Sequence, residues 1–83
     1  MYKDFEGKKV SIIVSSRGGN ILRYDGTLEK AGETVILSEA NISILTAQFG
    51  RNVFGSDSSI YTIMQGVLKT SINPENIISV QNK

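Results

Sequence analysis

The chain has 83 residues, with nine Lys and Arg, eight Asp and Glu, no His and no Cys, and a net charge of +1. This length has room for one domain, predicted to span residues 1–83, whose core is thin. The absence of Cys and His excludes disulfides and Cys/His metal sites and removes the commonest catalytic base and thiol. We therefore expect a non-enzymatic protein with no cofactor and no metal, stabilised by oligomerisation.

No apolar run in the chain approaches the roughly 20 residues of a membrane span, and the N-terminus lacks the apolar region of a secretory signal. These features predict a cytoplasmic protein without a membrane partner. The hydrophobic residues make up 40% of the chain and are spread along it, which favours a folded domain over disorder.

The first elements are a turn of helix and a strand. Residues 2–6 predict a short N-terminal helix that ends at Gly7. After it, apolar and polar residues alternate with the two-residue period of a strand that turns one face to a core. The apolar positions of this strand are Val10, Ile12 and Val14.

A hairpin and the most regular strand come next. Residues 16–20 contain two adjacent glycines and an asparagine, which favours a hairpin turn. The alternative, an anion-binding nest at Arg17-Gly18-Gly19, ranks below it. In the following strand we expect Gly26 to mark a bend or the close approach of another backbone. The apolar face of this strand is predicted to hold Leu22, Tyr24, Gly26 and Leu28.

Residues 34–46 are rich in β-branched side chains and predict a third strand. Its apolar positions change phase, so we expect a β-bulge at residues 38–40 that bends the strand. Residues 48–59 are predicted to form a loop, residues 60–72 a fourth strand with a second possible bend at Gly66, and residues 76–80 a last one, with Pro74 between them. The expected fold is a strongly bent, five-stranded antiparallel sheet that closes into a small barrel.

The segment Tyr24-Asp25-Gly26-Thr27-Leu28 resembles the first motif of the Sm/LSm family, in which a strand of the pattern aromatic-x-Gly-x-Leu precedes a second apolar strand. The segment Ile72-Asn73-Pro74-Glu75-Asn76-Ile77 is similar to the second motif of that family. The resemblance implies a homo-oligomeric ring in which the fourth strand of one subunit pairs with the fifth strand of the next. It also implies that RNA is a partner.

The family's RNA-contact positions correspond here to Gly32, Thr34, Ile36 and Asn73, with Pro74 in place of a glycine. These residues lack the usual aspartate, stacking aromatic, asparagine and arginine, so the uridine pocket of typical members is not expected. Thr34 and Asn73 remain as candidate RNA-binding residues.

The long loop supplies two further candidates, because Arg51 and Phe54 pair a charge with a ring that can stack on single-stranded nucleic acid. The alternatives are a mobile loop or a subunit contact. Two functions therefore stay open: binding of RNA or single-stranded nucleic acid through a non-standard surface, or a scaffold that binds a protein partner. Asp25, Glu29 and Glu39 are predicted to be solvated and to have no catalytic role.

Overall fold

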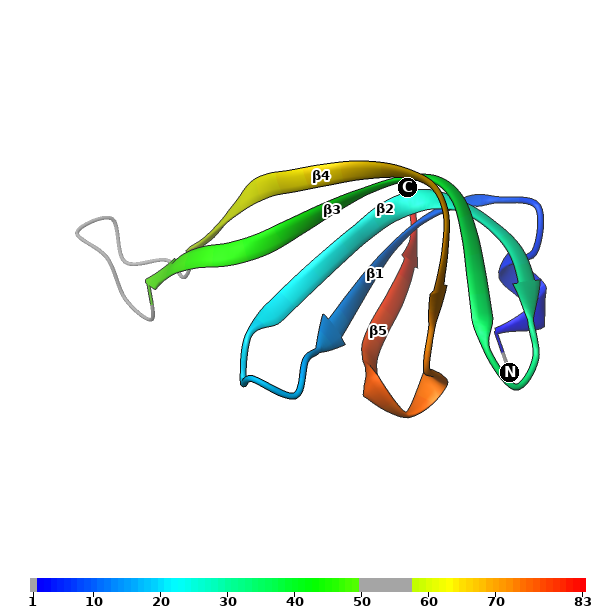
Figure 1. Cartoon of the computed structure of the whole chain (residues 1–83), viewed down its shortest axis with the longest axis horizontal. Coiled ribbons are helices and arrows are strands. Elements are labelled where there is room, and N and C mark those ends of the chain that lie inside the picture. The colour runs from blue at the N-terminus through cyan, green and yellow to red at the C-terminus, as the bar shows by residue number, and fades with distance from the viewer. Residues whose placement is uncertain (1, 50–57) are drawn as a thin grey trace.

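The computed structural model describes residues 2–49 and 58–83. The chain is mainly β, and its only helical elements in the described part are two short 3-10 turns (Figure 1). The elements in chain order are η1 (Lys3–Phe5), β1 (Lys9–Ser15), β2 (Ile21–Ala31), β3 (Val35–Phe49), β4 (Ser58–Ile72), η2 (Pro74–Asn76) and β5 (Ile77–Asn82).

The N-terminal helix predicted at residues 2–6 is only the single 3-10 turn η1, so that prediction is too long. Gly7 has a φ of +82°, a backbone conformation that glycine adopts without steric cost. Its N–H donates a hydrogen bond to the carbonyl oxygen of Leu28 at 2.7 Å. The chain is therefore turned into β1 before a longer helix can form.

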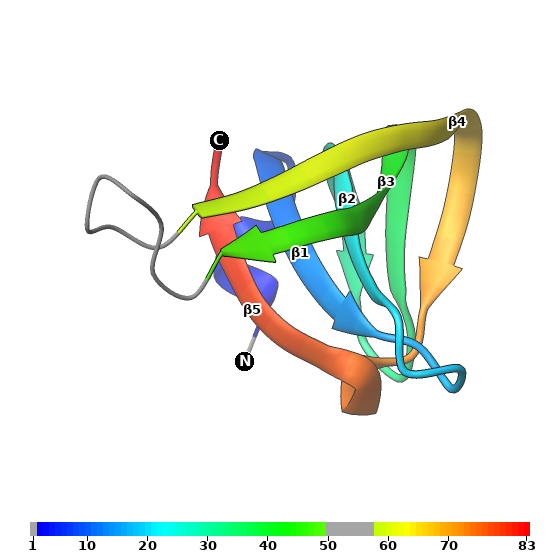
Figure 2. The same cartoon turned by 90° about the vertical axis from the view of Figure 1, so that its left-hand side faces the viewer.

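The five strands form one antiparallel sheet in the order β4-β3-β2-β1-β5. The sheet is strongly bent. In Figure 2, β4 bends at the upper right, and β5 runs along the opposite, lower left side of the molecule. No pairing joins β4 to β5 among residues 2–49 and 58–83. The predicted five-stranded antiparallel sheet is confirmed, whereas within one chain the sheet stays open and does not close into a barrel.

One face of the bent sheet carries the hydrophobic core, as the alternation in the sequence predicts. Tyr24 is half-buried and packs against this core, which agrees with its predicted place on the apolar face of β2. The hairpin predicted at residues 16–20 is also present, with Gly19 at a φ of +85°. The buried core residues are Val10, Ile12, Val14, Leu28, Ala31, Val35, Leu37, Ala40 and Ile72.

The bend of the sheet lies where Gly26 on β2 faces a bulge on β3. The register between β2 and β3 shifts between the pairs Asp25–Asn41 and Thr27–Ser38, which leaves Glu39 in a bulge at a φ of +49°. A Cβ atom on Gly26 would lie 2.9 Å from the carbonyl oxygen of Ser38. Both sequence predictions, the bulge at residues 38–40 and the close approach at Gly26, are therefore confirmed.

The hairpin of β3 and β4 is longer than expected. β2 pairs with β3 only as far as Ile44, and beyond it β3 and β4 continue to pair with each other up to Phe49 and Ser58. We call residues 45–49 and 58–61 the arm; Figure 1 shows it projecting beyond the other strands. The loop predicted at residues 48–59 is thus wrong at both ends, because hydrogen bonding between the two strands continues there.

Candidate functional site

The two motif-derived candidates, Thr34 and Asn73, lie at the same end of the sheet. Val35 pairs with Ile72, so Thr34 and Asn73 each follow directly beyond that pair. Both are exposed. The carbonyl oxygen of Thr34 accepts a hydrogen bond from the Gly32 N–H at 3.1 Å, which closes the turn between β2 and β3.

Asn73 has a structural task at this position. Its Oδ1 accepts a hydrogen bond from the Glu75 N–H at 3.0 Å and so caps η2, where Pro74 occupies the first turn. A capping asparagine of this kind satisfies an N–H that the helix itself leaves unpaired. The acceptor of Asn73 is therefore used within the fold.

Next to these two residues is a hollow of about 240 Å³, formed by segments distant in the sequence. Tyr2 and Lys3 come from the start of the chain, Ala31 and Gly32 from the end of β2, and Pro74 from η2. We call it the rim hollow. Its lining residues include two that carry rings, Tyr2 and Pro74, and one that has no side chain, Gly32. A Cβ atom on Gly32 would meet nothing within 4 Å, which confirms that the space beside it is open.

Contacts with β2 hold the N-terminal segment against the rim hollow. Glu6 Oε2 accepts a hydrogen bond from the Ala31 N–H at 2.8 Å, and both Tyr2 and Phe5 pack against the core. Lys3 is the one charged residue among the described residues that line the rim hollow, so stacking is better provided for than phosphate binding.

Arg51 and Phe54, the two loop candidates, lie outside the described residues. Their role remains a sequence-based prediction.

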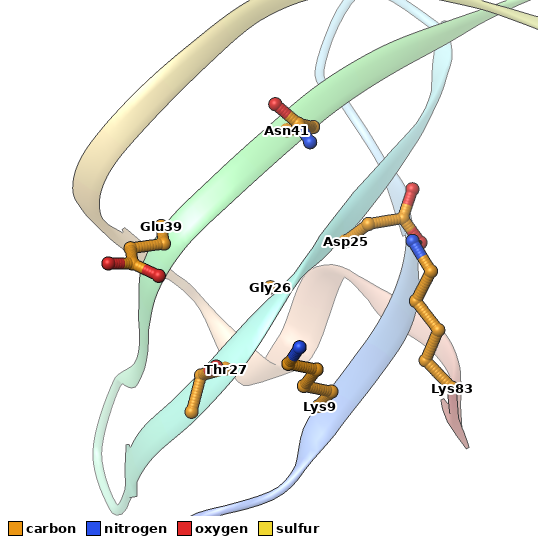
Figure 3. A pocket seen from close by; sticks show the side chains of 7 residues that line it. All are labelled: Lys9, Asp25, Gly26, Thr27, Glu39, Asn41 and Lys83. Atoms are coloured by element: carbon orange, nitrogen blue, oxygen red, sulfur yellow. The ribbon is translucent and has the colours of Figure 1, made fainter.

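A second depression, of about 310 Å³, lies on the outer face of the sheet (Figure 3). Asp25 is only 7% exposed there, so the prediction that it is solvated is wrong. Its Oδ2 accepts a hydrogen bond from Arg23 Nε at 2.9 Å, and its Oδ1 lies 3.6 Å from Lys83 Nζ. The residues that line this depression are Lys9, Asp25, Gly26, Thr27, Glu39, Asn41 and Lys83.

Two charged groups of the outer depression, Asp25 and Lys83, are engaged within the fold, which makes this depression a weak candidate for a ligand site. Two lysines and two carboxylates line it, so their charges balance, and the charge of Asp25 is already compensated by Arg23 and Lys83. Across residues 2–49 and 58–83, no group of three or more His, Cys, Asp or Glu could hold a metal ion.

The guanidinium of Arg23 lies 4.7 Å from the centre of the Tyr61 ring, a cation–π contact that links β2 to β4.

Between β2 and β4, Ser43 on β3 pairs with Arg23 on one side and with Ile63 on the other. It is fully buried, and its Oγ has no hydrogen-bond partner among the described residues. A buried hydroxyl without a partner costs stability.

The prediction that Glu29 is solvated is correct, since its side chain is 41% exposed. A hydrogen bond from Lys69, whose Nζ lies 3.2 Å from Glu29 Oε1, and a second from Ser38 lower the pKa of this carboxyl.

Sequence reasoning missed the lining residues Tyr2, Lys3 and Pro74 as a group. Each was noted for its local effect, as part of the opening turn or as the end of a strand. No pattern in the sequence shows that positions 2, 32 and 74 meet. For Asp25 a signal existed, because Arg23 and Asp25 are two residues apart and so share one face of a strand.

Comparisons with known proteins add no family: no family model, no curated protein and no solved structure matches the chain. Within the described segments, no helix is long and apolar enough to cross a membrane.

Proposed function

We propose that the protein is a non-enzymatic, Sm-like oligomeric ring protein that binds single-stranded RNA or DNA at the rim hollow. The observation that carries the proposal is the meeting of Tyr2, Gly32 and Pro74 beside Thr34 and Asn73. Proteins that bind single strands combine rings on which bases stack with cations along the backbone path. Tyr2 offers the ring and Lys3 the cation, although the surface differs from a conventional uridine pocket.

Ring assembly is supported by the two free edges of the sheet. β4 and β5 are both edge strands, and an exposed edge is a template for pairing with another chain. The nine buried hydrophobic residues found in the described part of the chain also form a small core, which association would extend. Light scattering at micromolar concentration tests this part: a mass of several chains is expected, and a stable monomer would remove the ring from the proposal.

Nucleic-acid binding is tested by fluorescence polarisation with oligo-U, oligo-A and mixed single strands at two salt concentrations. We expect saturable binding at low salt. The key variant is Gly32→Val, because Gly32 lines the rim hollow and a Cβ added there meets nothing within 4 Å. The matched control is Gly18→Val in the β1–β2 turn, where an added Cβ meets only the side chain of Asn20 at 3.9 Å.

Gly32→Val should weaken binding and Gly18→Val should not. Tyr2→Ala is expected to raise Kd about 5- to 150-fold, because stacking of a base on an aromatic ring contributes about 1–3 kcal/mol. Equal affinities of the two glycine variants would exclude the rim hollow. No saturable binding at low salt to any strand would exclude the nucleic-acid function.

The second candidate function is a scaffold that binds a protein partner. The observation that favours it is the exposure of large hydrophobic side chains on both edge strands, because exposed apolar surface is a mark of protein interaction sites. Co-purification of a partner that is lost when the segment at residues 48–59 is shortened would support it. The exposed residues are Ile63, Met64, Leu68 and Ile78.

A further inference from the structure

Residues 2–6, which we call the N-terminal turn, bring Tyr2 and Lys3 to the rim hollow. Two backbone hydrogen bonds close this turn. The Phe5 N–H donates to the carbonyl oxygen of Tyr2 at 3.0 Å. The Glu6 N–H donates to the carbonyl oxygen of Lys3 at 3.1 Å. The two bonds tie the start of the turn to its end, so a contact that fixes the end of the turn also fixes Tyr2.

The side chain of Glu6 ties the end of the N-terminal turn to β2. β1 pairs with β2 only up to Thr27, so the last residues of β2 extend beyond the end of β1. Gly32 bonds to Thr34 across the β2–β3 turn, and by the alternation of an antiparallel pair Ala31 directs its N–H away from β3. This N–H donates a hydrogen bond to Glu6 Oε2 at 2.8 Å. Because the acceptor is a carboxylate, the bond is stronger than one between neutral groups.

Other contacts of the N-terminal turn do not replace this bond. Tyr2 and Phe5 pack against the core, but hydrophobic packing is not directional, so the hydrogen bond is the contact that sets where the turn lies along β2. Asp4 carries the same charge as Glu6 in the same turn. Its side chain is exposed and makes no hydrogen bond or ion pair within residues 2–49 and 58–83.

We propose that Glu6 is the positioning residue of the rim hollow: through its hydrogen bond to Ala31 it holds Tyr2 where a base stacks. This role rests on the proposed binding of single-stranded nucleic acid at that hollow. Glu6 itself touches no base and acts through Tyr2. When the bond is removed, the fraction of molecules with Tyr2 in place falls, and the apparent Kd rises by the inverse of that fraction.

The first experiment needs no nucleic acid. Amide hydrogen exchange followed by NMR reports whether the Ala31 N–H is held in a hydrogen bond. Glu6→Ala should speed the exchange of this amide by about tenfold or more, because a hydrogen bond to a charged group is lost. Asp4→Ala is the matched control and should leave the exchange unchanged. Far-UV circular dichroism checks that each variant folds.

The second experiment measures affinity by fluorescence polarisation with labelled oligo-U, oligo-A and mixed single strands at low salt. Glu6→Ala should raise Kd on the order of fivefold. The sign of this effect is diagnostic, because removal of a carboxylate makes the chain more positive and by itself favours binding to a phosphate backbone. Asp4→Ala removes the same charge from the same turn and should bind at least as tightly as the wild type.

Two conservative variants separate the reach of the Glu6 side chain from its charge. Glu6→Gln loses the charge but keeps an oxygen acceptor at the same reach, so it should restore most of the affinity. Glu6→Asp keeps the charge but is one methylene shorter, so it should bind as weakly as Glu6→Ala. In a Tyr2→Ala background, Glu6→Ala should have little further effect on Kd, because both changes remove the same stacking contact.

The outcomes distinguish the role of Glu6 from the proposed function. Unchanged exchange of the Ala31 amide in Glu6→Ala, or an unchanged Kd of this variant while the wild type binds, would overturn the positioning role and leave the proposed function standing. Additive effects of Glu6→Ala and Tyr2→Ala on Kd would also overturn it. A wild type that binds none of the strands would remove the proposed function, and the positioning role with it.

Discussion

Replacing Gly26 with alanine tests the physical basis of the bend. The added Cβ would lie 2.9 Å from the carbonyl oxygen of Ser38 and 3.0 Å from both Cα and Cβ of Ala40. These atoms belong to the bulged part of β3 and cannot rotate away. Overpacking of this kind costs about 1–3 kcal/mol. The lower entropy of the unfolded alanine chain offsets about 0.4–1 kcal/mol of that cost. We therefore expect Gly26→Ala to lower the free energy of unfolding by about 1–2 kcal/mol.

The assay is urea unfolding followed by far-UV circular dichroism at one fixed protein concentration, because self-association raises apparent stability. In a thermal scan the same change lowers Tm by roughly 5–15 °C, since each 1 kcal/mol shifts a domain of this size by about 4–8 °C. Gly32→Ala is the control, because its Cβ meets nothing. Gly66→Ala should lie between the two, since its nearest atom is the movable side chain of Asn41 at 3.2 Å. Equal stability of Gly26→Ala and Gly32→Ala would refute the steric account of the bend.

Three further predictions concern the outer face. Ser43→Ala should raise the free energy of unfolding by about 1 kcal/mol, because a buried hydroxyl without a partner is removed; a lower urea midpoint would contradict this. A double-mutant cycle of Arg23→Gln and Tyr61→Leu should give a coupling of about 0.5–1 kcal/mol for the cation–π contact, and additive effects would show that the contact contributes nothing. The pKa of Glu29 is lowered in the fold, mainly by Lys69, so the ionised carboxylate stabilises the fold above the ordinary pKa of 4.5, and this stabilisation is lost as pH falls through the lowered pKa. Over this fall in pH, Glu29→Gln should therefore lose less free energy of unfolding than the wild type. Urea titrations that give parallel pH profiles for the two proteins would contradict a lowered pKa of Glu29.

The local features of the fold were accessible from the sequence. A two-residue alternation predicts strands with one buried face, and the phase change between Leu37 and Ala40 predicts a bulge, because both residues must face the same core. A glycine within the regular strand β2 predicts close approach at Gly26. These conclusions depend on near neighbours in the chain, which is why they did not require the tertiary structure.

The candidate site was only partly accessible. Motif positions selected Thr34 and Asn73 as candidates, and the register places both just beyond the Val35–Ile72 pair. The rim hollow itself depends on contacts among residues about 30 to 70 positions apart. Periodic patterns in the sequence report only on near neighbours, so they do not predict such contacts.

The sequence by itself determined a thin-cored, strand-rich domain with a bend at Gly26. Only the tertiary structure decided that the sheet stays open within one chain, that β3 and β4 extend into an arm, and that Asp25 is buried with Arg23 and Lys83 as its charge partners. The physical reason is that side-chain alternation fixes which face of a strand is apolar. Which strands become neighbours, and what covers the polar face, is set by packing between distant segments.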